Sequence, residues 1–396
     1  MKLIRHRPEF AIFTVFFFVA TVLGHWVPRI PDIKEKLALS DSALGFTLLA
    51  LPLATMLGLA AAAWVIRQIG LRNSCRLALP MWALLFILPG LAANQLQLML
   101  ALAATGMAVG LMETAMNTEA ARLENVTGRR LMSRSHGFWS LGSMFGAMSG
   151  AFVADAGISV ARHFLLAMPV IAVVGYLAAS ALPVEIKDAS RTGDSCDPVS
   201  SEPCFRLPTA TILMLCIMPL GVLMIEGAFV DWSAIFMREH LSATPLITGI
   251  TYATFASAMA VVRLSGDSLA SRFGDYQVVL WSGIAATLGI LLFALASNTL
   301  VALFAAVLAG AGSAVVFPLA VTAAANRPGK SAADNVVSLN MIAFTAFFLA
   351  PPLVGFLSEA FSLRIALLTL VPAAIVTVLL AGEVQPTGNR AGCIRR

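Results

Sequence analysis

Twelve long apolar stretches, separated by short polar segments, fill most of this 396-residue chain, which is 59% hydrophobic and 12% charged. A helix needs about 20 apolar residues to cross the hydrocarbon core of a bilayer. Lipid cannot satisfy open backbone groups, so such spans are helices. The pattern therefore predicts an all-α membrane protein with twelve transmembrane helices. Their approximate ranges are 10–27, 42–65, 76–94, 97–119, 135–155, 162–182, 209–230, 245–264, 276–297, 300–323, 335–357 and 364–381.

One long polar segment divides these stretches six to six. Residues 183–208 are rich in Asp, Ser, Glu and Pro, a composition typical of a flexible linker. We expect an N-terminal six-helix bundle over residues 1–182, a cytoplasmic linker over 183–208 and a C-terminal six-helix bundle over 209–396. The loops over 28–41 and 231–244 are amphipathic, and we expect both to lie along the periplasmic surface.

An internal repeat supports the division into halves. Residues 39–45 resemble residues 243–249, and Gly70 corresponds to Gly274, both at an offset of 204 (274 minus 70). Gly110 is paired with Gly312 at an offset of 202 (312 minus 110). Parallel repeats of this kind are found in one group of transporter folds.

The distribution of basic residues predicts the orientation. With twelve spans, the chain ends and every second loop lie on the same side of the membrane, and this side carries 20 of the 26 Lys and Arg residues. In membrane proteins the side with the excess of Lys and Arg is the cytoplasmic one. We therefore expect a multi-pass protein of the cell inner (plasma) membrane with both termini cytoplasmic. The net charge of +5 is explained by these basic residues, which contact anionic lipid headgroups, and it does not indicate nucleic acid binding.

The fourth span carries a narrow polar stripe. Gly106, Gly110, Glu113 and Asn117 recur at spacings of four, three and four, which places them on one helix face. An ionisable side chain inside a span costs about 2.5–3.5 kcal/mol and so marks a functional position. We expect Glu113 to exchange a proton as a central cavity opens to either side. The alternative is a permanent ion pair with a cytoplasmic arginine such as Arg134.

Polar and aromatic residues of other spans are further candidates for binding substrate or protons. Glu226, in the seventh span, is expected to face the cavity. Trp232 at the rim either stacks on a sugar-like ring or, as we favour, anchors the protein at the membrane interface, and His25 has the same two alternatives. Three candidates remain, and two of them, His136 and Asn340, have two alternative roles. The three are His136 (proton relay or headgroup-level hydrogen bonding), Trp139 on the same helix face, and Asn340 (cavity lining or a bond to a neighbouring helix).

The segment after the eighth span resembles a known family. Residues 263–274 contain Gly-Asp-x-x-x-x-Arg-x-Gly, which is similar to the cytoplasmic gating loop of the major facilitator superfamily. In the first half, Arg67 stands where that family usually keeps an Asp. The resemblance implies gating roles for Arg263, Gly266, Asp267, Arg272 and Gly274, and for Gly70 and Arg72 in the first half.

A narrower resemblance covers residues 136–142, 226–232 and 317–319. These segments are similar to a bacterial inner-membrane subgroup that includes the permease-like protein of the rhizopine (inositol-derivative) locus and is distantly like fucose permeases. The resemblance implies the major facilitator fold and alternating-access transport of a sugar, polyol or inositol derivative.

The remaining sequence features narrow the function class. No nucleotide-binding motif is present, so we expect a proton-coupled secondary transporter and not one driven by ATP. No catalytic constellation is present either, so we do not expect an enzyme. We also expect no cofactor or metal, and a functional monomer. Methionines such as Met112, Met116 and Met224 would equally suit amphipathic drug-like compounds, and proton-driven efflux of these is the alternative. Pro318 is expected to kink the tenth span.

Overall fold

The computed structural model describes residues 8–129, 131–183, 210–328 and 331–385, and within them every regular element is a helix. Ten helical segments among these residues are long and apolar enough to cross a membrane. The 24-residue α9 and the shorter apolar segment Leu363–Leu379 account for the other two predicted spans. The prediction of an all-α protein with twelve transmembrane helices is confirmed.

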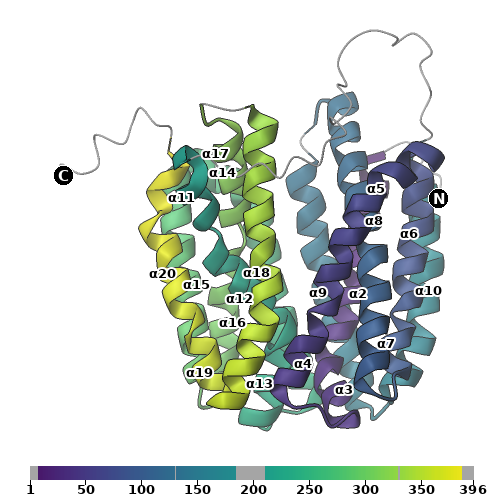
Figure 1. Ribbon diagram of the computed structural model, residues 1–396. Coiled ribbons are helices and arrows are strands. Elements are labelled where there is room, and N and C mark those ends of the chain that lie inside the picture. Colours follow the sequence, from purple (N-terminus) through teal and green to yellow (C-terminus); the bar gives the residue numbers. More distant parts are fainter. Residues whose placement is uncertain (1–7, 130, 184–209, 329–330, 386–396) are drawn as a thin grey trace.

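The helices form two bundles, which Figure 1 shows side by side. The N-terminal bundle consists of α2 (Pro8–Trp26), η1 (Val27–Arg29), α3 (Ile30–Lys36), α4 (Asp41–Leu48), α5 (Ala50–Ile69), α6 (Leu71–Leu85), α7 (Ile87–Leu91), α8 (Gln95–Thr127), α9 (Met132–Asp155) and α10 (Val160–Ser180). The C-terminal bundle consists of α11 (Ala210–Ile217), α12 (Leu220–Asp231), α13 (Ser233–His240), α14 (Pro245–Phe273), α15 (Asp275–Leu295), α16 (Thr299–Ser313), α17 (Val316–Ala325), α18 (Ala332–Ala360), α19 (Leu363–Leu368), α20 (Leu370–Leu379) and η2 (Ala381–Val384). The predicted linker falls almost wholly outside the described residues, so the domain boundaries stay a prediction.

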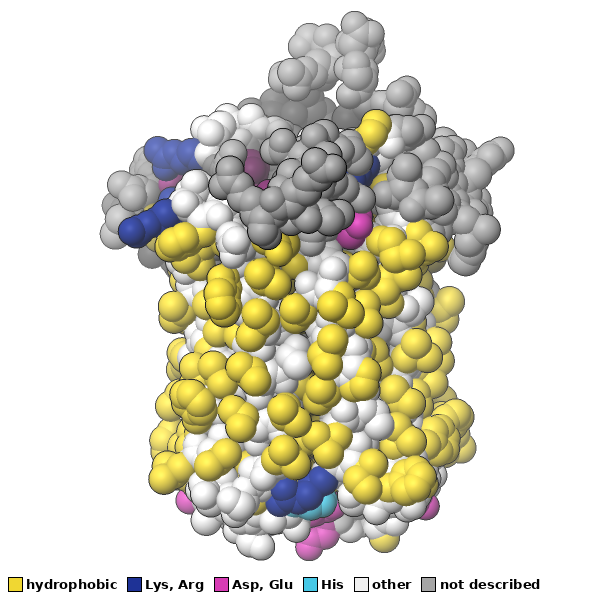
Figure 2. Space-filling view, turned by 90° about the vertical axis from the view of Figure 1, so that its left-hand side faces the viewer, with side chains coloured by type: hydrophobic (Ala, Val, Ile, Leu, Met, Phe, Trp, Pro, Cys, Tyr) yellow, Lys and Arg dark blue, Asp and Glu magenta, His cyan; other side chains and the backbone are white. Residues whose placement is uncertain are grey.

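The outer surface is that of a protein solvated by lipid. Figure 2 shows hydrophobic side chains covering the middle of one face, with charged side chains gathered toward its two ends. Large apolar residues such as Trp281 and Leu300 are 64% and 76% exposed. Such exposure would be costly in water but is favourable against the hydrocarbon core of a bilayer.

The two bundles repeat the same local structure at an offset of 204 residues. Ser40 and Thr244 each accept a hydrogen bond from the backbone N–H three residues on, and so each caps the start of a helix. Gly70 and Gly274 stand between consecutive helices with φ of 80° and 79°, a conformation that glycine adopts without strain. The repeat predicted from these segments is confirmed.

One predicted pair in that repeat is wrong. A Cβ added at Gly110 would meet the carbonyl of Thr55 on α5, whereas one at Gly312 would meet Ala286 on α15, so the two glycines contact non-equivalent helices. Small residues recur every few positions along these spans, which makes a single-residue match unreliable.

The structurally equivalent pair is Gly106 and Gly310, again 204 apart. A Cβ at Gly106 would lie 2.2 Å from the carbonyl oxygen of Leu51, and a Cβ at Gly310 would lie 2.2 Å from that of Phe255. Leu51 and Phe255 are themselves 204 residues apart. Each bundle therefore needs a glycine at the same close approach between its second and fourth spans.

Among the described membrane spans, two pairs make the main contacts between the bundles, and these pairs differ in extent. The first pair, α9 and α14, packs from Gly249 against Ala151 near one end to Gly137 against Leu264 near the other. The second pair is the second span, which consists of α4 and α5, and the eleventh span, α18. Here α18 packs mainly against α4 and makes few contacts with α5. The second pair is therefore closed at the predicted periplasmic end and diverges toward the predicted cytoplasmic end.

Candidate functional site

Arg263 lies at the centre of a polar cluster between the two bundles. Its Nη2 is 3.4 Å from Oε1 of Glu226 on α12, and its Nη1 donates to Oγ of Ser140 on α9 over 3.1 Å. The side chains of Arg263 and Glu226 are only 15% and 21% exposed. Arg263 stands ten residues before the end of α14, about 15 Å along the helix at 1.5 Å per residue. A charged pair is thus held inside the span and linked to the opposite bundle.

A third contact of Arg263 depends on a break in the tenth span. Its Nε donates to the carbonyl oxygen of Ala314 over 3.3 Å, between the end of α16 and the start of α17. In a continuous helix this carbonyl would accept from residue 318, but Pro318 has no N–H. The predicted disturbance of the helix at Pro318 is confirmed, and the freed carbonyl is used by Arg263.

Two further polar side chains border this cluster. His136, on α9, lies close enough to Arg263 for electrostatic interaction, and its ring meets Phe16 edge-on at 5.4 Å between centroids. Tyr252, on α14, is 4% exposed and lies within electrostatic range of Glu226 and Arg263. Of the residues proposed from the sequence, the structure thus brings together Glu226, His136 and Arg263.

Glu113 and Asn117 form a separate pair on α8. The Asn117 amide donates to the carboxylate oxygen Oε2 of Glu113 over 3.1 Å and to its backbone carbonyl over 2.8 Å. Within the described residues Glu113 forms no ion pair, and Arg134 is exposed. The permanent latch considered for Glu113 is therefore not formed, and its role in proton exchange stays a prediction.

The segment assigned to a gating loop is mostly helix. Arg263, Gly266, Asp267 and Arg272 all belong to α14, which continues to Phe273, and only Gly274 follows its end. The loop assignment is wrong because nothing before Gly274 ends the helix. Its 29 residues reach about 43 Å, well beyond the roughly 30 Å hydrocarbon core.

The gating residues of that helix occupy different environments. Asp267 and Arg272 are exposed, whereas a Cβ at Gly266 would lie 2.9 Å from Val315 on the tenth span. In the first half, Arg72 belongs to α6 and donates to the backbone carbonyl of Ser180. The gating function of these residues stays a prediction.

Two residues proposed for the membrane rim are buried instead. Trp232 is 0% exposed, so the interfacial anchor that the sequence favoured is wrong; its Nε1 has no hydrogen-bond partner among the described residues. His25 is 6% exposed, with Nδ1 2.9 Å from Nε2 of His163 and Nε2 3.3 Å from Oγ of Ser149. His25 thus contacts α9 and α10, and the Trp232 ring lies beside Gly355 on α18, so both side chains are packed between helices.

Trp139 and Asn340 are half-buried, and their ligand contacts stay a prediction. Trp139 packs against the main hydrophobic core. Asn340, on α18, makes no hydrogen bond to any described residue.

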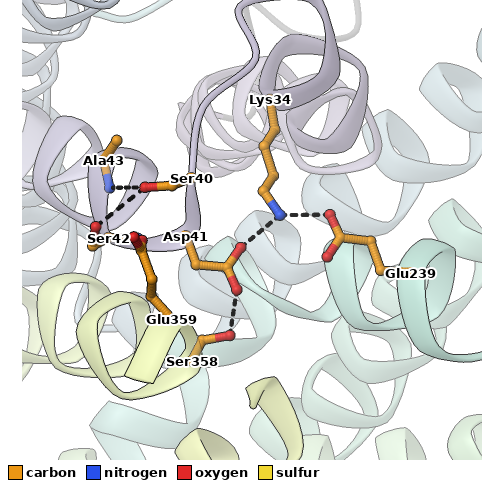
Figure 3. A network of polar contacts seen from close by, with 8 residues as sticks. All are labelled: Lys34, Ser40, Asp41, Ser42, Ala43, Glu239, Ser358 and Glu359. Atoms are coloured by element: carbon orange, nitrogen blue, oxygen red, sulfur yellow. Dashed lines mark hydrogen bonds and ion pairs between the residues drawn. The ribbon is translucent and has the colours of Figure 1, made fainter. Parts of the chain in front are cut away.

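A second polar cluster joins the bundles at the predicted periplasmic end (Figure 3). Nζ of Lys34, on α3, lies 2.5 Å from Asp41 at the start of α4 and 2.5 Å from Glu239 on α13 of the other bundle. Ser358, on α18, donates to Asp41, and Glu359 accepts from the backbone N–H of Ser42 over 2.8 Å. We call Lys34, Asp41, Ser42, Glu239, Ser358 and Glu359 the interbundle cluster.

Neighbouring contacts reinforce the interbundle cluster. Arg238, on α13, lies 3.3 Å from Asp32 on α3, and Asp155 accepts from the backbone N–H of Leu246 over 3.3 Å. The loops over 28–41 and 231–244, expected at this surface, supply most of these groups as short helices. Together the contacts hold the predicted periplasmic ends of the two bundles against each other.

The sequence alone predicts neither the interbundle cluster nor the position of Arg263 between the two bundles. Lys34 has the appearance of an ordinary basic residue beside a membrane surface, and nothing local indicates its partner 205 residues away. For Arg263 a signal was present, since it stands at the edge of an apolar span. The resemblance to a loop sequence obscured it.

Comparisons with known proteins agree with this architecture. A family model described as Major Facilitator Superfamily matches residues 10–347 and 232–390. An uncharacterized MFS-type transporter of Yersinia pestis is 28% identical over 89% of this chain and 89% of its own length. Membrane protein MosC of Rhizobium meliloti is 25% identical over 91% of this chain and 86% of its own length, in keeping with the resemblance to the rhizopine-locus subgroup.

Solved structures share the fold at low sequence identity. The nucleoside transporter NupG superposes with a TM-score of 0.72 at 12% identity, covering 96% of this chain and 99% of that one. The Escherichia coli fucose:proton symporter FucP superposes with a TM-score of 0.62 at 17% identity, over 96% of this chain and 99% of that one. The two likenesses establish the arrangement of helices.

Proposed function

Because the chain belongs to the Major Facilitator Superfamily, we propose that it is a secondary active transporter that moves a sugar, polyol or inositol derivative across the inner membrane by alternating access. The relatives and structural neighbours include an MFS-type transporter and a nucleoside transporter, which indicates a transporter and not an enzyme. Their names also support the substrate class, since they include a nucleoside transporter and a fucose:proton symporter. Drug efflux has no comparable support.

The observation that carries this proposal is the bond from Arg263 to both Glu226 and Ser140. It places an ion pair where the two bundles meet and ties that pair to a helix of the opposite bundle. A solute bound there would contact both bundles, as alternating access requires. Its hydroxyls could accept from the Arg263 guanidinium and donate to the Glu226 carboxylate.

We propose that proton coupling uses this pair together with Glu113 on α8. When Glu226 takes up a proton it loses its negative charge, and its attraction for Arg263 falls to that of a neutral hydrogen-bond partner. Arg263 then keeps its contacts with Ser140 and Ala314 and is free to hold the solute. The ionisation state of Glu226 is in this way linked to a bond between the bundles.

The conformation that fits the contacts is inward-facing. The interbundle cluster closes the predicted periplasmic end, and α5 diverges from α18 toward the other end. The excess of basic residues at the chain ends and alternate loops supports cytoplasmic termini in the inner membrane. We expect the monomer to be the functional unit, with protons and solute as its small-molecule partners and no resident cofactor.

Uptake into proteoliposomes tests the proposal. Labelled inositols and sugars are offered with and without an inward pH gradient. A proton driven by a gradient equivalent to 100 mV supplies about 2.3 kcal/mol, enough for roughly fifty-fold accumulation. Glu226→Gln should lose accumulation and keep exchange of solute across the membrane, while Glu35→Gln, an exposed acid on α3, serves as the matched control.

Each contrary result removes a defined part of the proposal. Equal uptake with and without the pH gradient would exclude proton coupling. Failure to transport any inositol or sugar, together with expulsion of amphipathic cations, would replace the substrate class by the efflux alternative.

A further inference from the structure

A groove of about 470 Å³ lies on the outer face of the N-terminal bundle, away from the interface between the bundles. Its lining comes from one face of α6 and α7 and a single residue of α10. The lining residues are Arg76, Leu77, Pro80, Met81, Leu84, Leu85, Leu88 and Tyr176. Leu77, Leu84 and Leu88 are exposed by 42% to 53%, so the groove faces the surrounding lipid.

The groove has the length of one leaflet. Arg76 and Leu88 are twelve residues apart, about 18 Å along the helix axis. Half of a roughly 30 Å hydrocarbon core is about 15 Å. The polar end at Arg76 lies near the start of α6, on the predicted cytoplasmic side, and the apolar part runs from there toward the middle of the membrane.

Close packing of α6 on α10 builds the polar end. A Cβ at Gly175 would lie 2.1 Å from Cδ2 of Leu79, so the two helices approach closely at this point. Beside it, the Arg76 guanidinium lies over the Tyr176 ring, 4.9 Å from its centroid, and donates to the Tyr176 hydroxyl. Arg72, one turn earlier on α6, donates to the backbone carbonyl of Ser180.

These two arginines carry charge that the described residues do not neutralise. Neither Arg72 nor Arg76 forms an ion pair with a described carboxylate, and the Nε of each is buried without a hydrogen-bond partner there, which leaves the Nη groups for a headgroup. A guanidinium has five N–H donors, and the bonds to Asn73 and Tyr176 occupy two of those of Arg76. Uncompensated positive charge beside hydrocarbon favours an anionic partner, and basic pockets between helices on the cytoplasmic side bind anionic headgroups.

We propose that this groove binds one anionic phospholipid, with one acyl chain along α6 and its phosphate against Arg76 at the end of the groove and Arg72 one turn beyond the lining residues. The shape selects a chain of leaflet length, and the arginine pair selects a negative headgroup. Arginine suits this task because the planar guanidinium can present two parallel N–H donors to the oxygens of a phosphate.

Native mass spectrometry of the detergent-purified full chain tests the site. Delipidated protein is titrated with phosphatidylglycerol or phosphatidylcholine of identical acyl chains. Wild type should prefer phosphatidylglycerol by about 30-fold, the factor expected from two arginines near an anionic surface. The double variant Arg72→Gln/Arg76→Gln should lose this preference, whereas Arg67→Gln, an exposed arginine at the end of α5, should keep it.

A second variant separates chain binding from charge. Leu84→Trp fills the groove from its lipid-exposed side, removes no arginine, and should weaken binding of both lipids. The proposal is overturned if Arg72→Gln/Arg76→Gln retains the wild-type preference, or if Leu84→Trp binds both lipids as wild type does. It is equally overturned if inorganic phosphate displaces phosphatidylglycerol at equal concentration, because the site would then be one for a free anion.

Discussion

Nζ of Lys34 and Oε1 of Glu239 lie 2.5 Å apart, and this ion pair joins the two bundles at the predicted periplasmic end. Glu239 is 42% exposed, so solvent screens the pair and limits its worth to about 0.3–1 kcal/mol. Glu239→Gln should therefore shift the equilibrium away from the inward-facing state by about two- to fivefold. Spin labels at Ala93 and Ser297, exposed positions on the two bundles, would report the change as a longer distance distribution.

The matched control is Glu35→Gln. Glu35 lies on the same short helix as Lys34 but is exposed and forms no ion pair with a described residue. An unchanged distance distribution for Glu239→Gln, or an equal shift for Glu35→Gln, would argue against a specific closing role for the interbundle cluster.

Arg263→Lys should reduce transport by at least about tenfold while leaving the protein folded. The guanidinium reaches Glu226, Ser140 and the Ala314 carbonyl at once, and an ammonium lacks the fixed fork geometry that such a set of acceptors needs. Initial uptake rates in proteoliposomes measure the effect. Arg162→Lys, an exposed arginine on α10, should transport normally, and wild-type rates for Arg263→Lys would remove Arg263 from the mechanism.

Pro318→Ala should lower turnover several-fold without lowering thermal stability. Alanine restores an N–H that can donate to the Ala314 carbonyl within the helix, and this bond competes with the one from Arg263. Uptake rate and melting temperature are measured together. Pro169→Ala, a substitution inside α10, is the control. An equal effect of the two substitutions on the uptake rate would contradict the prediction.

Gly106→Ala and Gly310→Ala should destabilise the protein by similar amounts, about 1–3 kcal/mol each. At both positions the new methyl group would lie 2.2 Å from a backbone carbonyl oxygen, so the helices must separate. Thermal unfolding in detergent compares them with Gly382→Ala, where nothing lies within 4 Å. A marked effect at one position and none at the other would show that the two bundles are not equivalent there.

Glu113→Gln should abolish proton-driven accumulation and leave membrane insertion intact. The carboxylate sits in the fourth span with an amide, that of Asn117, as its hydrogen-bond partner, so its charge is not compensated by a described cation. Accumulation with and without a pH gradient is measured against the yield of folded protein. Normal accumulation would assign Glu113 a structural role and leave Glu226 as the coupling carboxylate.

Much of the candidate site could be anticipated from single residues, but its pairings could not. Glu226 and His136 were identifiable because polar groups are costly in an apolar span. Arg263 was placed in a loop, although its neighbours in space are Glu226 and Ser140, 37 and 123 residues away. The sequence favours the membrane surface for Trp232, because it does not show that this ring lies against Gly355, 123 residues away on α18.

Twelve membrane-spanning helices, their repetition at an offset of 204 residues and the side that carries most basic residues are all evident in the order of amino acids. The reason is that the bilayer imposes span length, helical structure and charge bias on each segment separately. The folded protein was needed to show that Lys34 pairs with Glu239, that Arg263 pairs with Glu226, and that Gly106 corresponds to Gly310. Those relationships depend on how whole helices pack and rotate against one another. A contact between residues hundreds of positions apart leaves no local pattern in the chain.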